Sequence, residues 1–282
     1  MNLDIVGQAA ASAFPRRLMP FLKWAGGKRQ LLSQLAPSIP PTYDAYIEPF
    51  LGGGALYLAL EPPWAILGDL NQDLIVCYQV IRDHLDALLT DLDRHVYDRE
   101  YYYQVRAEDP STLSSIARAS RFLYLNKCGY NGLYRVNARG QFNVPFGRYA
   151  TPPRLYHAKS IRAISALLRA ADVRVAPYQE TMDRAHAGDF VYLDPPYHPL
   201  SGTSSFTAYT AGAFGVRDQE ELAAWYRLLD RRGCRLMLSN SSAPLIRALY
   251  HDFRVEEVHA TRAINSDPLA RGAITELVVL NY

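Results

Sequence analysis

Short apolar runs alternate along this chain with longer segments whose apolar residues recur every three or four positions. Runs of the first kind are typical of buried β-strands, and segments of the second kind are typical of amphipathic helices. Strand-like runs occupy residues 46–50, 65–67, 173–176, 190–193, 236–238, 254–258 and 275–280. Helix-like segments occupy residues 30–35, 55–60, 73–92, 114–125, 158–171, 218–232 and 243–250. The alternation predicts an α/β fold: a largely parallel sheet covered on both faces, with the last two strands as an antiparallel hairpin at one edge.

The segment Asp194-Pro195-Pro196-Tyr197 follows the apolar run 190–193, so it stands where a buried strand ends. Ligands bind at this edge of open α/β sheets. The two prolines fix φ and lack N–H donors, which leaves the Asp194 carboxylate and the Pro195 carbonyl as acceptors beside the Tyr197 ring. These groups fit a flat ring with an exocyclic amine, such as adenine, on which the tyrosine stacks. The alternative interpretation is a simple turn.

A glycine turn, Gly52-Gly53-Gly54, joins the apolar run 46–50 to the helix-like segment 55–60. A strand, a glycine turn and a helix form the first half of a nucleoside-binding unit, in which glycines let the ligand approach the backbone. Asp69 ends the next apolar run and lies 15 positions after Gly54. An acidic side chain near this place binds ribose hydroxyls in such folds.

Trp24, Gly26, Gly27 and Lys28 precede the helix-like segment 30–35. A phosphate-binding P-loop is excluded, because Leu22 replaces its first glycine and Arg29 replaces its Ser or Thr. An aromatic ring and cations near a helix N-terminus suit a small zwitterion that carries a carboxylate. The three motifs together predict a ligand with adenine, ribose and an amino-acid tail, of which S-adenosylmethionine is the common example.

Positive charge is concentrated in the middle of the chain. The net charge is only +2, yet residues 110–171 contain no Asp or Glu, ten Lys or Arg and many interleaved aromatics. Basic side chains neutralise phosphates and aromatic rings support displaced bases, so this stretch predicts a nucleic-acid interface rather than a solvated basic face. Asn131-Gly132 predicts a hairpin turn that fits the major groove of DNA. There Arg135 would pair with guanine, and Asn131 or Asn137 with adenine.

With these motifs, the chain resembles the Dam-type, D12 class (class alpha) DNA adenine N6-methyltransferases from about residue 21 to residue 282. The resemblance also includes residues 129–135, 142–149 and 206–209. It implies a Rossmann-like, doubly wound S-adenosylmethionine-dependent methyltransferase fold, with residues 21–72 and 165–282 as the catalytic domain. Residues 73–164 would be an inserted, mainly helical DNA target-recognition domain, and residues 1–20 a flexible tail.

The resemblance also implies roles for individual residues. The methyl donor would contact Trp24, Ala25, Gly26, Lys28, Glu48, Pro49, Phe50, Gly52, Gly54, Asp69, Glu180 and Asp194. The target adenine, flipped out of the duplex, would be held by Asp194, Pro195, Pro196 and Tyr197. Lys23, Leu133, Arg135 and Pro145 would contact the bases of a 5′-GATC site, and Tyr130 and Asn131 would help open the duplex. Asn137, from the groove geometry above, and Arg148 complete the expected DNA-binding residues. Two alternatives stay open, since Glu48 equally fits a helix cap and Glu180 a surface carboxylate.

The composition adds few restrictions. The chain has no run of 18 or more apolar residues, so we expect no membrane segment. Its three cysteines and seven histidines show no disulfide or metal spacing, which predicts reduced thiols in a cytoplasm, of a bacterium or of a phage-infected cell, and no metal cofactor. A monomer that acts on double-stranded DNA is expected, alone or alongside a cognate restriction endonuclease. Methylation of cytosine N4 or of RNA, and a DNA-binding regulator with a decayed catalytic domain, remain alternatives.

Overall fold

The fold was analysed in a computed structural model that describes residues 18–200, 214–261 and 273–282. Most of the predicted tail over residues 1–20 lies outside the described residues. So does the motif at residues 206–209. Residues 201–215 are rich in Ser, Thr, Gly and Ala, which predicts a loop over the ligand-binding edge of the sheet, and most of this stretch also lies outside the described residues.

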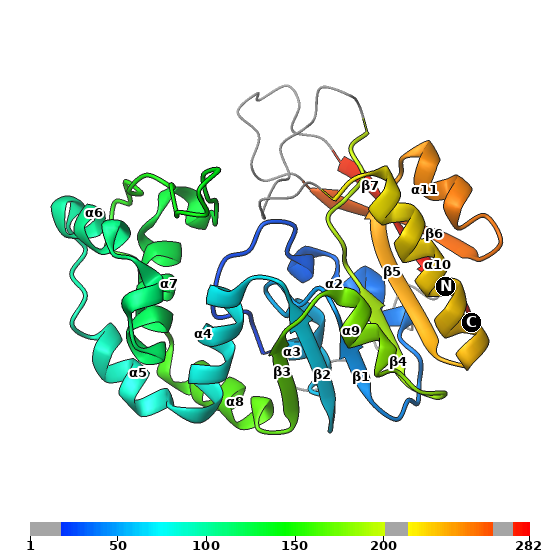
Figure 1. The fold of residues 1–282 in the computed structure, drawn as a ribbon, viewed down its shortest axis with the longest axis horizontal. Helices are drawn as coiled ribbons and strands as arrows, with labels where there is room; N and C mark the ends of the chain where they lie inside the picture. Colours follow the sequence, from blue (N-terminus) through cyan, green and yellow to red (C-terminus); the bar gives the residue numbers. More distant parts are fainter. Residues whose placement is uncertain (1–17, 201–213, 262–272) are drawn as a thin grey trace, which may run out of the picture.

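A seven-stranded sheet forms the centre of the protein (Figure 1). Its strands are β1 Tyr46–Glu48, β2 Ala65–Asp69, β3 Ala171–Val175, β4 Phe190–Leu193, β5 Arg235–Ser241, β6 Arg254–Thr261 and β7 Ala273–Leu280. They lie in the order β3-β2-β1-β4-β5-β7-β6, parallel from β3 to β5, with β7 antiparallel to both β5 and β6. The predicted parallel sheet with an antiparallel edge hairpin is therefore confirmed.

Helices cover both faces of this sheet. The described helices are α2 Leu32–Leu35, α3 Ala55–Leu60, α4 Gln72–Asp83, α5 Leu85–Leu92, α6 Arg99–Ala107, α7 Ser115–Cys128, α8 Ala158–Leu168, α9 Tyr178–Asp183, α10 Val216–Arg232 and α11 Pro244–Leu249. Because strand side chains alternate between faces, Phe190 and Tyr192 of β4 pack in the core with α3, α4 and α8, while Val191 and Leu193 pack with α9, α10 and α11. This two-sided burial explains why the strands read as nearly continuous apolar runs.

The main error in the predicted elements is the single helix over residues 73–92. The structure has two helices, α4 and α5, which are separated at His84 with φ −136° and ψ 35°. Apolar residues keep helical spacing across this break, because Leu74, Tyr78 and Ile81 of α4 and Leu88 and Leu92 of α5 all enter one core. The helical spacing of apolar residues therefore continues across a position where the helix itself is interrupted.

Other boundaries moved by a few residues, and two helices were missed. β1 ends at Glu48 because Pro49, which has no N–H, follows it. Segment 158–171 ends as a helix at Leu168, and its last residue, Ala171, already starts β3. The missed helices are α6, which Asp98 caps through the backbone N–H of Tyr101, and the short α9.

The helices α5, α6 and α7, here called the helical module, lie at one end of the molecule, with α4 and α8 between them and the sheet (Figure 1). Phe122 and Leu123 of α7 belong to the same core as Ala65 and Leu67 of β2. A smaller core around Tyr102 and Tyr124 joins α6 to α7. The module is therefore packed onto the sheet domain, and the division at residues 73–164 stays a prediction.

Candidate active site and nucleic-acid interface

Three carboxylates lie at the carboxyl edge of the sheet. Glu48 is the last residue of β1, Asp69 is the last residue of β2, and Asp194 directly follows β4. Since β2, β1 and β4 are parallel neighbours, these side chains gather at one edge, where open α/β sheets bind ligands. Burial is the main cause that raises the pKa of Glu48, and the charges of Asp194 and Asp69 add to it.

Lys28 is the cation at this edge. Its Nζ lies 2.8 Å from Asp194 Oδ1 and 2.7 Å from the carbonyl oxygen of Gly26. The same Nζ lies 4.6 Å from the ring centroid of Tyr197, a cation–π contact. Only 4% of the lysine side chain is exposed, so these partners compensate for its desolvation. The structure thus brings four of the predicted site residues into direct contact.

Asp194 titrates in an unusual range. Burial raises its pKa to about 6, the neighbouring charge of Lys28 opposes this shift, and the charge of Glu276 adds to it. The carboxylate is therefore an ionised acceptor at neutral pH that becomes protonated in mild acid.

The glycine turn is fastened to Asp69. The backbone N–H of Gly52 donates to Asp69 Oδ2, and that of Asn71 donates to Oδ1, both at 2.9 Å. Gly52 has φ 47°, and a Cβ there would lie 2.8 Å from Cδ1 of Trp24, so conformation and space both require glycine. Trp24, Gly52 and Asp69 consequently lie together, as the sequence predicted. Burial raises the pKa of Asp69, and its backbone hydrogen bonds lower it in part.

Glu48 is buried, and its contacts bear on its two predicted roles, a contact with the donor and a helix cap. The hydroxyl of Tyr46 donates to Glu48 Oε2 at 2.9 Å. Burial raises the pKa of Glu48 well above its usual range, while Tyr46 and the backbone N–H of Tyr57, in the first turn of α3, lower it. The helix cap and the contact with the donor both stay predictions.

An aromatic group lies beside the end of β1. Pro49 is buried, and the ring of Phe50 stacks on Tyr178 of α9 with centroids 5.2 Å apart. Phe214 meets both rings edge-on. Glu180 is exposed in the first turn of α9, and Ala25 is half-buried beside Trp24. The exposed position of Glu180 is compatible both with a contact to the donor and with a simple surface carboxylate.

Sequence reasoning missed Glu276 of β7. The hydroxyl of Tyr197 donates to Glu276 Oε2 at 2.5 Å, so the tyrosine is fixed at its outer end. A separation of 79 residues along the chain leaves no local signal for this pair. The available clue concerned Glu276 alone, because this acidic residue directly precedes the buried apolar run 277–280.

Lys23 and Trp24 connect this site to the helical module. The backbone N–H of Lys23 donates to Asn126 Oδ1 at 2.9 Å, and Asn126 Nδ2 donates to the carbonyls of Lys23 and Gly132 at 2.8 and 3.0 Å. Trp24 stacks on Tyr134 with centroids 5.3 Å apart. Predicted donor-site and DNA-contacting residues are thus neighbours in one segment.

The predicted hairpin exists, but its tip is not at Asn131-Gly132. Both residues have positive φ, 54° and 65°, as a tight turn requires. Antiparallel bridges pair Gly129 with Phe146 and Val136 with Phe142, so the chain reverses later, at residues 137–141. The prediction was wrong about register because local turn chemistry does not reveal which arms pair.

The hairpin presents several predicted contact residues. Tyr130, Arg135, Pro145 and Arg148 are exposed, and Leu133 is half-buried. Arg135 Nε donates to Asn143 Oδ1 at 2.7 Å, which orients the guanidinium before any ligand arrives. Asn137 Oδ1 accepts from the backbone N–H groups of Arg139 and Gln141, so this side chain shapes the tip. Its proposed contact with adenine stays a prediction.

A pocket of about 430 Å³ lies between α6 and the hairpin. Four of the nine lining residues are predicted DNA-contacting residues, and five were not predicted, among them the pair Arg99 and Tyr103 of α6. The lining is Arg99, Tyr103, Tyr130, Asn131, Pro145, Phe146, Gly147, Arg148 and Tyr149. The signal for the missed pair was available, because Arg99 and Tyr103 are spaced four apart on α6 behind the capping residue Asp98.

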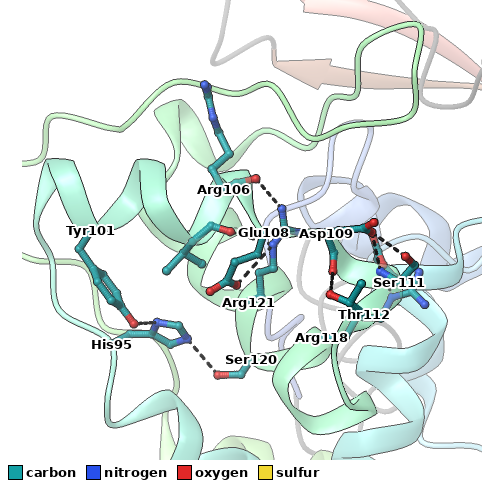
Figure 2. Close-up of polar contacts among 12 residues, drawn as sticks. His95, Tyr101, Arg106, Glu108, Asp109, Ser111, Thr112, Arg118, Ser120 and Arg121 are labelled. Carbon is teal, nitrogen blue, oxygen red and sulfur yellow. Dashed lines mark hydrogen bonds and ion pairs between the residues drawn. The ribbon is translucent and has the colours of Figure 1, made fainter.

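Some basic residues of the middle region serve the fold instead (Figure 2). Arg121 of α7 is 6% exposed and donates to the carbonyls of Val105 and Arg106 at the end of α6, at 2.9 and 2.8 Å. Arg118 pairs with Asp73 of α4, and Arg162 pairs with Asp86. The ten charges therefore overstate the surface available for phosphates.

His95 in the same view is also structural. Its ring nitrogens lie 2.8 Å from the hydroxyl of Tyr101 and 3.0 Å from that of Ser120 (Figure 2). Its ring stacks on Tyr124 at 4.3 Å, and burial lowers its pKa.

Across residues 18–200, 214–261 and 273–282, no three His, Cys, Asp or Glu side chains form a group able to hold a metal ion. Within the same ranges, no helix has the length and apolar character needed to cross a membrane.

A family model and individual relatives both relate the chain to DNA methyltransferases. Residues 24–264 match the family described as D12 class N6 adenine-specific DNA methyltransferase. The chain is 42% identical to the type II methyltransferase M1.LlaDCHI of Lactococcus lactis subsp. cremoris over 94% of its own length and 96% of that protein. It is 37% identical to the DNA adenine methylase of Escherichia coli (strain K12), covering 92% of this chain and 94% of that one.

Proposed function

Because the chain belongs to the D12 class N6 adenine-specific DNA methyltransferases, we propose that it methylates N6 of adenine within 5′-GATC, with S-adenosylmethionine as donor. Transfer of methyl groups to DNA adenine follows from the family and from relatives named DNA adenine methylase. The donor, the site sequence and the residue roles are the proposed part. The observation that carries the donor and the catalytic roles is the contact of Asp194 with Lys28 beside Tyr197 at the sheet edge. The GATC sequence is proposed from the relatives named DNA adenine methylase.

The residues at this edge fit the proposed donor. Asp69 and the positive-φ glycines Gly52 and Gly54 suit a ribose held close to the backbone. Phe50, next to Pro49 and stacked on Tyr178, offers a flat apolar surface for the adenine ring, near Glu180. Lys28, Gly26, Ala25, Trp24 and Glu48 are assigned to the amino-acid end of the donor. When bound, S-adenosylmethionine supplies a methyl group on a positively charged sulfur.

The target adenine is assigned to residues 194–197. Lys28 engages Oδ1 of Asp194, so we assign Oδ2 and the Pro195 carbonyl to the two hydrogens of N6, with Tyr197 stacked on the ring and Pro196 stiffening the turn. These acceptors would free the nitrogen lone pair to form the new N–C bond. The electron pair of the broken carbon–sulfur bond would stay on the donor's sulfur, which becomes a neutral thioether, and the proton that N6 loses would pass by way of the Asp194 carboxylate to water. Orientation and fixed acceptors supply most of the rate gain.

Recognition of duplex DNA is assigned to the hairpin and to Lys23. Extrusion of the adenine costs a few kcal/mol, and we assign Tyr130 and Asn131 to filling the gap. Lys23, Leu133, Arg135, Asn137 and Pro145 are assigned to base edges, and Arg148 to a phosphate. We further propose that the protein acts as a monomer in a bacterial or phage-infected cytoplasm. Pairing with a restriction endonuclease is a proposal supported by relatives named type II methyltransferase.

The proposal is tested by transfer of labelled methyl from S-adenosylmethionine to matched duplexes with GATC intact or scrambled. N6-methyladenine in the GATC duplex alone is the expected product. Label in both duplexes or in neither contradicts the GATC assignment, and N4-methylcytosine contradicts the assigned product.

A further inference from the structure

We propose that Gln219 and Asn240 are positioning residues that fix the direction of the Pro195 carbonyl during methyl transfer. The inference rests on the proposed assignment of residues 194–197 to the target adenine. Neither residue touches the reacting atoms. Both lie behind the loop that follows β4, Gln219 in α10 and Asn240 in β5.

A chain of side-chain hydrogen bonds holds this loop. Gln219 Nε2 donates to the carbonyl of Pro196 at 2.9 Å, and Asn240 Nδ2 donates to Gln219 Oε1 at 3.1 Å. Asn240 Oδ1 accepts the backbone N–H of His198 at 3.2 Å, and Ser241 Oγ donates to the carbonyl of His198 at 2.6 Å. Residues 196 and 198 are therefore anchored on both sides of Tyr197.

The two amides in this series of hydrogen bonds lie inside the protein and not on its surface. Gln219 and Asn240 are both 0% exposed. Buried amides are unfavourable unless they are hydrogen-bonded, and apolar side chains of similar size would pack this position without that risk. The polar pair thus gives the loop a defined path, which an apolar pair would not specify.

The effect on Pro195 follows from the backbone. Proline rings fix φ at residues 195 and 196, and neither residue has an N–H with which to join a ladder. Once the Pro196 carbonyl and the His198 N–H are held, the peptide plane that carries the Pro195 carbonyl has little freedom to rotate. A displacement of about 1 Å in a reacting geometry costs about 100-fold in rate, so this constraint matters for transfer.

The test compares Gln219→Leu, Gln219→Glu and a matched control in single-turnover methylation. Gln79→Leu is the control, because Gln79 Nε2 also donates to a backbone carbonyl, that of Val173 at 2.8 Å, away from the site. Gln219→Leu is expected to lower the single-turnover rate about 10- to 100-fold, with KM for DNA and the donor Kd within about twofold. Gln79→Leu is expected to keep the wild-type rate.

Gln219→Glu supplies a readout that a loss of folding would not produce. A protonated glutamic acid still donates to Pro196, whereas the ionised form repels that carbonyl, and burial favours the protonated form. The rate of this variant is therefore expected to fall as pH rises above neutrality, where the wild type stays flat. The proposal is overturned if the rate of Gln219→Glu depends on pH as that of the wild type does. It is also overturned if a folded Gln219→Leu variant has the wild-type rate. If Asp194→Ala remains active, the assigned active site fails instead.

Discussion

The sheet edge and the hairpin present their polar side chains in opposite ways. At the edge, Lys28 and Asp194 are paired with each other and Tyr197 is held by Glu276 before any ligand is present. On the hairpin, Tyr130 is 53% exposed, and Arg135 and Arg148 are also exposed. A small rigid ring needs fixed acceptors, whereas a long polyanion needs accessible cations. Substitutions at the edge should therefore affect rate, and substitutions on the hairpin should affect affinity and sequence preference.

The largest effect is expected from Asp194→Ala. The variant loses an acceptor for N6, so methyl transfer should fall by about 10³-fold. The measurement is the single-turnover rate, with thermal unfolding to confirm a folded protein. Asp252→Ala, which removes an exposed carboxylate paired with Arg227, is the control and should retain activity. A folded and active Asp194→Ala enzyme would remove the edge from the mechanism.

Arg135→Ala tests the other side of the comparison. A bidentate contact with guanine is worth about 1–3 kcal/mol, so discrimination against a changed guanine should drop about 10- to 100-fold. Competition between cognate and single-substituted duplexes measures this loss. Arg139→Ala removes an exposed cation from the hairpin tip and should weaken both duplexes equally. Equal behaviour of the two variants would contradict the assignment of Arg135.

The pH dependence of methyl transfer should show that Asp194 at the sheet edge is the acceptor. Because the pKa of Asp194 is about 6, kcat/KM should fall about tenfold per pH unit below that value, as the acceptor becomes protonated. Glu276 raises this pKa, so Glu276→Gln should move the acid limb to lower pH while an amide oxygen still accepts from Tyr197. Glu257→Gln, at an exposed position of β6, should leave the limb in place. An unmoved limb in Glu276→Gln would contradict the role given to its charge.

Arg99→Gln should have the smallest effect. Its guanidinium lines the pocket beside Arg148, so its loss should weaken DNA binding a few-fold and reduce the salt slope by about one. Binding isotherms at several salt concentrations measure both quantities. Arg254→Gln on the edge strand β6 removes an exposed cation at the other end of the sheet and should change neither. An unaltered slope in Arg99→Gln would exclude the pocket from the interface.

Particular residues show how far sequence reasoning reached. Asp194 and Asp69 were found because each follows an apolar strand, and strand ends share one edge in a parallel sheet. The break at His84 was missed because helical spacing continues through it. Gln219, Asn240 and Glu276 were missed because their contacts join residues 21 to 79 positions apart. Local patterns locate elements and their ends, and only the folded chain shows which distant side chains meet there.

The amide of Asn126 gives the two regions a common mechanical link. It holds the backbone of Lys23 and the carbonyl of Gly132 together, and Trp24 and Lys28 follow within five residues. A shift of the hairpin would therefore move the segment that reaches the sheet edge. Thermodynamic linkage then makes the influence mutual, because any factor by which DNA tightens the donor is also the factor by which the donor tightens DNA.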